Sequence, residues 1–399
     1  MKLKFGIALW AHPHYGGVFQ YSMSVLNAAA ALDRDRYDVT VFYRHQEWTR
    51  YMHEGQWSNF SWIRYFANIP VTVLGLTCRI AERSSFFLDL YKRLHPLFHL
   101  AQSCKIDLMM YPAPISLSFE IGIPYIISVH DLQHRLHPEF PEVSRFGEWG
   151  RREYLFKNCS RRAAAVISES DAGKRDILSF YDIRQDAVHV LPYVPPFYLA
   201  HTKAADVVHR FGLPERYLFY PAQFWMHKNH VRLIEALALI KRENGLEIPI
   251  VFVGSKKNAY KRTMTRISEL GLSRQVMYLG YVSEEELIGL YKNPRALIMP
   301  TFFGPSNIPQ LEAFLLGCPV ITSDVPGIRE QVGDAAILVD PSSVESIAAG
   351  ISDVWSSEEL RQTLIRKGRA RTASWTQEQF SRAFQSIIAN VSRGLTRNQ

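Results

Sequence analysis

The chain has 399 residues, of which 47% are hydrophobic and 21% are charged, and its formal net charge at pH 7 is +8. This composition excludes a disordered chain, and the length leaves room for two domains. The sequence has no run of the roughly 18 apolar residues that a membrane-spanning helix needs, and no nucleic-acid-binding motif. The positive charge suits anionic partners such as nucleotide phosphates or acidic lipid headgroups, and it equally suits a solvated surface.

The first half of the chain alternates short apolar runs with helix-like patterns. The run FGIALW (5–10) has no cleavage site after it, so we predict a buried strand and not a signal peptide. The helical pattern VFQYSMSVLNAAAAL follows. Further strands are predicted at 37–43, 107–112, 124–131, 163–170 and 187–193. Apolar, β-branched runs separated by helices indicate a parallel sheet covered on both faces, which is the doubly wound α/β class.

The second half restarts this alternation after a break at LPYVPPFYLAHTKAAD (191–206), whose three prolines suggest a linker. Strands are predicted at 217–222, 248–254, 276–282, 296–301, 319–324 and 335–340. We therefore predict two Rossmann-like domains, residues 1–195 and 205–375. The final amphipathic stretch, 376–399, is predicted to be a helix that crosses back onto the first domain.

The cysteines have neither the spacing of a zinc site nor that of a disulfide framework. We expect reduced, buried cysteines in a cytoplasmic protein. The four are Cys78, Cys104, Cys159 and Cys318.

Open parallel sheets bind ligands at the carboxyl ends of their strands, where helices begin with unpaired N–H groups. Gly16 and Gly17 stand at the first such junction. They would let the backbone approach a phosphate or a sugar, or they simply form a tight turn. Lys228 follows the strand at 217–222 and suits a diphosphate, although lysines near helix starts are also often merely solvated.

Two patterns raise the question of a metal. His130 ends the strand at 124–131 and is followed by His134 and His137, but this spacing matches no known ligand pattern. We predict a hydrogen-bonding His130 at a cleft and no metal site. The DRD at 33–35 lies between a helix and a strand and is predicted to be an ordinary turn.

The segment FFGPSNIPQLEAF (302–314) combines a loop with an apolar helix that holds one carboxylate. Ser306 and Asn307 are typical N-cap residues, so helix N–H groups would point toward an anion. Glu312 has no obvious partner, and a buried carboxylate needs hydrogen bonds, for example from two ribose hydroxyls. A helix-start glutamate that offsets the helix dipole is the alternative.

Taken together, these segments resemble glycosyltransferase family 4 over nearly the whole chain. The resemblance rests on the GGV loop, HDLQH, the KN helix start, GYVS, and LEA followed by Gly-Cys-Pro-Val. It implies a retaining, nucleotide-sugar-dependent enzyme with the GT-B fold, in which two Rossmann-like domains face a cleft. The first domain would bind the acceptor and the second the donor.

The resemblance also implies roles for individual residues. Lys228 would hold the donor diphosphate and Glu312 the ribose hydroxyls, while His130 would face the donor sugar and Gly16 and Gly17 would close the cleft. Main-chain groups would line the base pocket and bind phosphate, at Tyr281, Val282, Asn307 and Ile308. No cofactor and no metal is expected.

The chain departs from the family pattern at two positions. The glutamate usual eight residues before the LEA glutamate is replaced by Gly304, and the arginine five residues before the lysine by Gln223. Both changes occur together in one branch of the family, so we interpret them as an altered donor site. Ser306 or Asn307 would substitute for the missing carboxylate, and Lys228 remains the main side-chain cation on the diphosphate.

The expected reaction is transfer of a mannosyl- or rhamnosyl-type hexose, as from GDP-mannose, to a glycan acceptor in bacterial polysaccharide, lipopolysaccharide or O-antigen synthesis. The basic, aromatic stretch 146–164 suits a membrane surface with lipid-linked acceptors, or a helix that packs its aromatic residues inward. We expect a cytoplasmic protein, peripheral on the inner membrane. A nucleotide-sugar epimerase, or a non-catalytic nucleotide-sugar binder, is the alternative.

Overall fold

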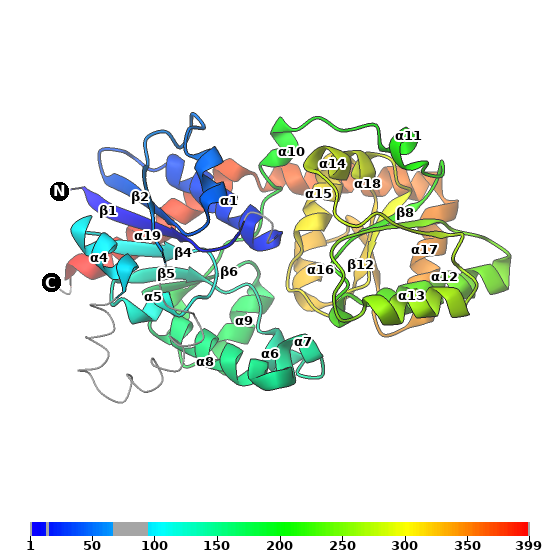
Figure 1. Cartoon of the computed structure of the whole chain (residues 1–399), viewed down its shortest axis with the longest axis horizontal. Helices are drawn as coiled ribbons and strands as arrows, with labels where there is room; N and C mark the ends of the chain where they lie inside the picture. The colour runs from blue at the N-terminus through cyan, green and yellow to red at the C-terminus, as the bar shows by residue number, and fades with distance from the viewer. Residues whose placement is uncertain (1, 13–15, 67–94, 398–399) are drawn as a thin grey trace. The chain divides into compact units, whose positions relative to one another are not determined.

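The computed structural model describes residues 2–12, 16–66 and 95–397 (Figure 1). The chain divides into two compact units. The first unit comprises Met1–Leu132, Gly150–Tyr193 and Gln377–Gln399, and the second comprises Gln133–Trp149 and Val194–Thr376. The predicted first domain, 1–195, thus contains one segment that the structure groups with the second unit, namely Gln133–Trp149.

The first unit is built on a parallel sheet of seven strands in the order β3-β2-β1-β4-β5-β6-β7. The strands are β1 (Leu3–Leu9), β2 (Tyr37–Tyr43), β3 (Ser61–Arg64), β4 (Leu108–Tyr111), β5 (Tyr125–Ser128), β6 (Ala165–Ser168) and β7 (Val188–Val190). Central strands are apolar on both faces, as the buried neighbours Ile7 and Ala8 of β1 show, because helices cover both sides of the sheet. Only β3 was not predicted from the sequence.

Helices surround this sheet: α1 (Gly17–Ala30), η1 (Gln46–Tyr51), α4 (Pro96–Ser103), α5 (Leu117–Glu120), α8 (Glu148–Arg161), α9 (Asp171–Phe180), η3 (Gln185–Ala187) and α19 (Gln377–Arg397). The last helix, α19, packs along α1 (Figure 1). Gln377 Nε2 donates to Ser24 O at 3.1 Å, and Gln385 Nε2 donates to Ala31 O. The predicted return of the C-terminal helix to the first domain is confirmed.

The second unit has a parallel sheet of six strands in the order β10-β9-β8-β11-β12-β13. These are β8 (Leu218–Pro221), β9 (Ile250–Val253), β10 (Val276–Tyr278), β11 (Ala296–Met299), β12 (Val320–Ser323) and β13 (Ala336–Val339). In each sheet the chain reverses its direction of travel across the sheet, between β1 and β4 in the first unit and between β8 and β11 in the second. Such a switch point is where open α/β sheets bind ligands.

The helices of the second unit are α6 (Gln133–Leu136), α7 (Pro141–Ser144), η2 (Arg145–Gly147), α10 (Tyr198–His201), α11 (Val207–Phe211), η4 (Met226–Lys228), α12 (His230–Asn244), α13 (Tyr260–Glu269), α14 (Glu284–Lys292), α15 (Ile308–Leu316), α16 (Pro326–Val332), α17 (Val344–Ser356) and α18 (Glu358–Ser374). The doubly wound α/β class predicted from the sequence is confirmed in both units.

Other sequence predictions meet mixed outcomes. Cys159 and Cys318 are buried and free, Cys104 is free but only half-buried, and Cys78 lies outside the described residues. None of the helices in the described part of the chain combines the length and apolar character that a bilayer crossing requires. The DRD at 33–35 forms the predicted turn, in which the Asp35 N–H donates to Asp33 Oδ1 at 2.9 Å.

The basic, aromatic stretch contains the whole of α8, which packs part of its aromatic surface inward. Phe156 is buried in the core of the first unit, with Tyr154 packed partly against the same core. The Arg152 guanidinium lies 4.9 Å from the centre of the Phe156 ring and also bonds to Asp131. Of the two readings of this stretch, these contacts favour the packed helix.

Candidate active site

Two loops meet at the switch point of the second sheet. One follows β8 and runs through η4 to α12, and the other follows β11 and leads to α15. The His227 carbonyl accepts bonds from Phe302 N at 2.8 Å and Thr301 Oγ1 at 3.0 Å. Asn229 adopts a left-handed conformation (φ 61°), and its Nδ2 donates to Pro300 O at 2.8 Å and Pro341 O at 2.7 Å. The two loops are therefore tied together beside Lys228.

Lys228 and Asn307, both predicted as donor-site residues, come together at this point. Lys228 Nζ lies 3.5 Å from Asn307 Oδ1, which is a long hydrogen bond. Asn307 Nδ2 and Ser306 Oγ are buried, and neither has a hydrogen-bond partner among the described residues. Buried polar atoms are rarely left unmatched, so these two groups indicate a place for a ligand atom or an ordered water.

The capping role predicted for Asn307 is wrong in its side-chain detail. Asn307 occupies the N-cap position of α15, but its side chain makes no capping bond. Pro309 is the second residue of the helix and has no N–H, so one of the two N–H donors from which a cap side chain usually accepts is missing. The Asn307 main chain bonds instead to Gln331, with N to Oε1 at 2.8 Å and Nε2 to the carbonyl at 2.9 Å.

Gly304 cannot simply be replaced by the glutamate that the family pattern has. Its φ of 140° belongs to glycine, and a Cβ there would come within 3.0 Å of Asn307 Nδ2. The loop also presses against α16, because a Cβ on Gly327 would lie 2.0 Å from Pro305 O. The loop at Gly304 therefore has a backbone conformation and a packing that favour glycine.

Glu312 is buried and has the partners that the sequence did not reveal. Tyr198 of α10 donates to Oε1 at 3.0 Å, and Tyr291 of α14 donates to Oε2 at 2.5 Å. Burial raises the pKa of Glu312, and the two tyrosine hydrogen bonds lower it by less, so that the pKa is about 7. The burial of this carboxylate is thus explained without a ligand, which corrects the interpretation that Glu312 has no structural partner. Contact with a ribose stays a prediction.

A second carboxylate at this site was missed in the sequence. Glu142 of α7 lies 2.7 Å from His227 Nδ1 and accepts from the His227 N–H at 3.1 Å and from Asn258 Nδ2 at 2.8 Å. Burial alone would raise the pKa of Glu142, but these hydrogen bonds outweigh it and hold that pKa at about 2. These bonds to Glu142 hold His227, the residue that immediately precedes Lys228, in place. No local pattern signals this pair, because 85 positions separate its members.

The remaining residues predicted for the second unit lie at the same edge of the sheet. Tyr281 and Val282 follow β10, and the neighbouring loop is joined to theirs by a bond from Gly254 N to Gly280 O at 2.8 Å. Tyr281 is 75% exposed. Gln223 accepts a bond from Trp225 Nε1 at 2.9 Å. Ile308 opens α15, so its N–H belongs to the first turn, which has no intrahelical acceptor.

In the first unit, His130 has partners for both ring nitrogens. Nε2 lies 2.7 Å from Pro112 O, and Nδ1 lies 2.8 Å from the Tyr193 hydroxyl. A carbonyl oxygen only accepts, so Nε2 carries the proton and Nδ1 accepts from Tyr193. Burial lowers the pKa of His130, which favours this neutral form. His130 is a hydrogen-bonded residue, as predicted, and whether it faces a donor sugar stays a prediction.

The glycine pair occupies the junction expected of it. Gly16 has φ 54° and precedes α1, whose first residue is Gly17. A Cβ on Gly16 would meet no atom within 4 Å, so glycine is required here by conformation and not by space.

His134 and His137, which follow His130 in the sequence, contact different partners. His137 pairs with Glu139 at 2.8 Å, and the ring of His134 packs edge-on against Trp149. In the described part of the chain, the group of three side chains that could hold a metal ion lies elsewhere, at His12, His45 and Glu47, with ligand atoms within 4.8 Å of one another.

Comparison with known proteins places this geometry in context. The model of the family "Glycosyltransferase Family 4" matches residues 16–193, and that of "Glycosyl transferases group 1" matches residues 202–371. The chain is 25% identical over 312 residues to O-antigen chain mannosyltransferase B of Escherichia coli, covering 74% of this chain and 78% of that one. It is 23% identical over 270 residues to the serotype-specific mannosyltransferase WbdA of the same organism, covering 63% of this chain but only 33% of WbdA.

A solved structure of HepE from Anabaena, in complex with UDP and glucose, is similar over 97% of this chain and 100% of that one. The TM-score is 0.72 and the sequence identity 19%. The GT-B fold predicted from the sequence is confirmed by this likeness.

Proposed function

The chain belongs to glycosyltransferase family 4, and we propose from that premise that it transfers a hexose from a nucleoside-diphosphate sugar to a glycan in bacterial polysaccharide or O-antigen synthesis. Two relatives are named mannosyltransferases, which supports a mannosyl-type donor such as GDP-mannose; a rhamnosyl-type donor is the second choice. The structural neighbour was solved with UDP and glucose, which supports a nucleotide-sugar ligand for this fold.

The observation that carries the proposal is the cluster at the switch point of the second sheet. It brings the Lys228 ammonium, Asn307 Nδ2 and Ser306 Oγ to the start of α15, and the last two have no partner among the described residues. All three can donate hydrogen bonds, and a helix start carries partial positive charge. A diphosphate presents oxygens that accept such bonds and a negative charge that matches them.

In the proposed reaction, the bond from the sugar C1 to the diphosphate oxygen breaks and a bond from C1 to an acceptor hydroxyl oxygen forms. The hydroxyl proton passes to the departing diphosphate, and attack on the same face retains the configuration. Negative charge grows on the leaving oxygen, where Lys228 and the N–H groups at the start of α15 stabilise it. We propose that this stabilisation operates without a metal or another cofactor.

The other residues take supporting roles in this proposal. Glu312 binds the ribose hydroxyls, and the main chain at Tyr281 and Val282 lines the base pocket. In the first unit, His130, Gly16 and Gly17 contribute to the sugar and acceptor side. The acceptor is a lipid-linked glycan at the cytoplasmic face of the inner membrane, and the net charge of +8 favours attachment to anionic lipid. Flotation with phosphatidylglycerol vesicles tests that attachment.

A thermal-shift screen against GDP, UDP, ADP and dTDP tests the donor assignment. A ligand at a hundred times its dissociation constant stabilises the folded protein by about 2.7 kcal/mol, so the correct diphosphate raises the melting temperature measurably. We expect the largest shift with GDP. Shifts of equal size with all four, or with none, contradict the assignment.

Release of nucleoside diphosphate from GDP-mannose, with and without an extract of lipid-linked glycans, tests the activity. A transferase releases the diphosphate only when an acceptor is present. Isomerisation of the sugar would indicate an epimerase, and binding without any release would indicate a non-catalytic binder.

A further inference from the structure

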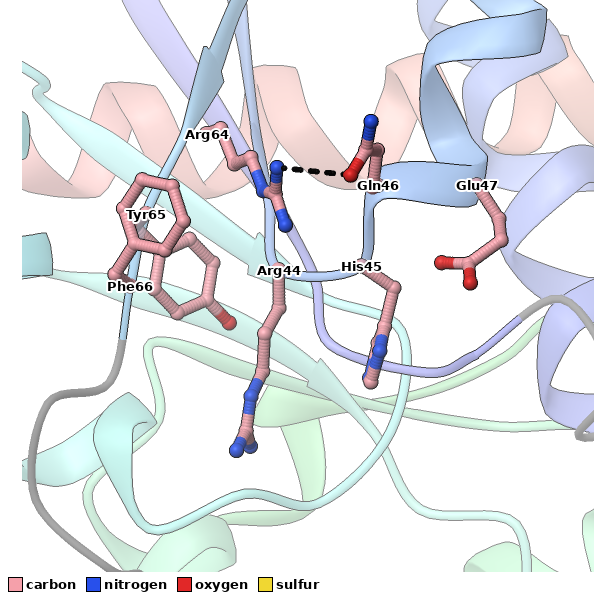
Figure 2. A pocket seen from close by; sticks show the side chains of 7 residues that line it. All are labelled: Arg44, His45, Gln46, Glu47, Arg64, Tyr65 and Phe66. Atoms are coloured by element: carbon pink, nitrogen blue, oxygen red, sulfur yellow. Dashed lines mark hydrogen bonds between the residues drawn. The ribbon is translucent and has the colours of Figure 1, made fainter.

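The first unit contains a pocket of about 410 Å³ that the donor site does not use. It lies at the carboxyl ends of β2 and β3, between the loop that leads to η1 and the end of β3 (Figure 2). Arg44, His45 and Glu47 line it from the first of these segments, and Arg64, Tyr65 and Phe66 from the second. This is the edge at which parallel sheets bind ligands, and one pocket here receives polar side chains from two neighbouring strands.

The pocket holds hydrogen-bond donors that the described protein does not satisfy. The Tyr65 hydroxyl belongs to a side chain only 1% exposed and has no partner, and Arg64 Nε is buried and likewise without one. The Arg44 guanidinium, half-buried, forms no hydrogen bond or ion pair within the described part of the chain. Figure 2 shows the Arg64 side chain joined to Gln46, a bond of 3.5 Å. Guanidinium groups only donate, so their natural partner is an oxygen with negative charge.

The charge of the pocket is favourable to an anion. Glu47 is its one acidic residue, and Glu47 Oε1 lies 3.3 Å from His12 Nε2, so this carboxylate already has a partner. Burial is the main cause that lowers the pKa of His45, and the nearby His12 and Arg44 lower it further, which keeps that ring neutral. Two arginines and one paired carboxylate therefore line the pocket.

The rim of the pocket is aromatic. Phe66 is 56% exposed, and the Arg64 guanidinium lies 4.7 Å from the centre of its ring. Stacking on the ring holds the guanidinium in one orientation, which suits two-point binding of an oxyanion. The free part of the ring offers an apolar surface of the kind on which a sugar ring packs.

We propose that this pocket binds an oxyanion, a phosphate or a carboxylate, carried by the acceptor glycan. Arg44 and Arg64 contact the anion, and the Tyr65 hydroxyl donates to it. This assignment of the acceptor class rests on the proposed glycosyltransferase function. It makes the first unit selective for acidic acceptors, because a neutral glycan would leave the buried donors unsatisfied.

Titration of the full chain with methyl phosphate, with glucuronate and with neutral methyl mannoside tests the proposal, each in the presence and absence of saturating GDP. Binding is measured by isothermal calorimetry. We expect one of the two anions to bind and the neutral sugar to bind at least tenfold more weakly. Methyl phosphate and glucuronate distinguish a phosphate-bearing acceptor from a uronic-acid one. The proposal is overturned if neither anion binds, or if binding disappears whenever GDP fills the donor site.

Variants locate the binding. Arg44→Gln is expected to weaken anion binding about tenfold, and Tyr65→Phe severalfold. Arg36→Gln removes the same charge from an exposed arginine at the opposite end of β2 and is expected to change nothing. Equal weakening in Arg36→Gln, or full binding in Arg44→Gln, overturns the proposal. Melting temperatures verify that each variant is folded. If GDP fails to bind while the Arg44-dependent anion binding persists, the proposed donor site is wrong and the pocket assignment stands.

Discussion

The two sheets differ in how the polar groups near their switch points are satisfied. In the first unit, His130 has Pro112 on one ring nitrogen and Tyr193 on the other, so the protein completes its hydrogen bonds. In the second unit, Ser306 Oγ and Asn307 Nδ2 are buried without a partner among the described residues, next to Lys228. A completed network positions a residue, whereas buried donors left unmatched indicate a ligand. The second switch point is therefore the stronger candidate for phosphate chemistry.

Replacing Lys228 tests this contrast with the largest expected effect. Lys228→Ala is expected to lower the rate of sugar transfer at least a hundredfold, which is about 3 kcal/mol of transition-state stabilisation. The loss arises because charge on the departing diphosphate loses its ammonium partner. Turnover measured with GDP-mannose checks this result. Lys261→Ala, at an exposed position of α13, is the matched control and should behave as wild type. An unchanged rate in Lys228→Ala would remove the proposed phosphate role.

Glu312 tests whether a partnered carboxylate still contributes to binding. Glu312→Gln is expected to weaken nucleotide binding by about 1–3 kcal/mol, because a ribose hydroxyl loses a charged acceptor. Calorimetry with the diphosphate identified in the screen measures the loss. An unchanged affinity would make Glu312 structural, held by Tyr198 and Tyr291 alone.

Glu312 should also make the stability of the nucleotide-free protein depend on pH, and the Glu312→Gln variant should lack this dependence. The pKa of Glu312 is raised from 4.5 to about 7, so the folded state binds a proton more tightly than the unfolded state. Its contribution to stability is therefore greatest below about pH 4.5 and falls as the pH rises to about 7, by about 3 kcal/mol in all. Denaturant unfolding of wild type and Glu312→Gln across this range should show the decline only in wild type. Parallel curves would contradict the raised pKa.

Replacing Tyr193 has the smallest expected effect, and it tests the hydrogen-bonded His130 of the first unit. Tyr193→Phe removes the donor to His130 Nδ1 and is expected to cost about 1 kcal/mol of stability, with less than a tenfold change in transfer rate. Chemical denaturation and steady-state kinetics measure the two quantities. A rate loss as large as that of Lys228→Ala would show that His130 takes a direct part in the chemistry and that the contrast between the two switch points fails.

Most strands were predictable because a buried parallel strand is an apolar run readable from a few consecutive residues. The exception, β3, has the sequence Ser61–Arg64, of which no residue is fully buried, so it lacks that pattern. Positions at strand ends are predictable for the same reason, which is why the sequence points to Lys228 and Asn307 as candidate site residues. Their partners were not, because Tyr198 is 114 positions from Glu312 and Glu142 is 85 from His227. Such contacts depend on the tertiary fold, and no local pattern encodes them.

The backbone at Gly304 has a consequence for engineering the donor specificity of this chain. Introducing Gly304→Glu would strain a backbone with φ 140° and would bring a Cβ to 3.0 Å from the Asn307 amide. Restoring the glutamate of the family pattern therefore requires grafting the whole loop between Thr301 and Ile308. Gly327 is kept in such a graft, because any side chain there would collide with a carbonyl at the position of Pro305 O. The loop and the start of α16 that it packs against would therefore be exchanged as a block and not one residue at a time.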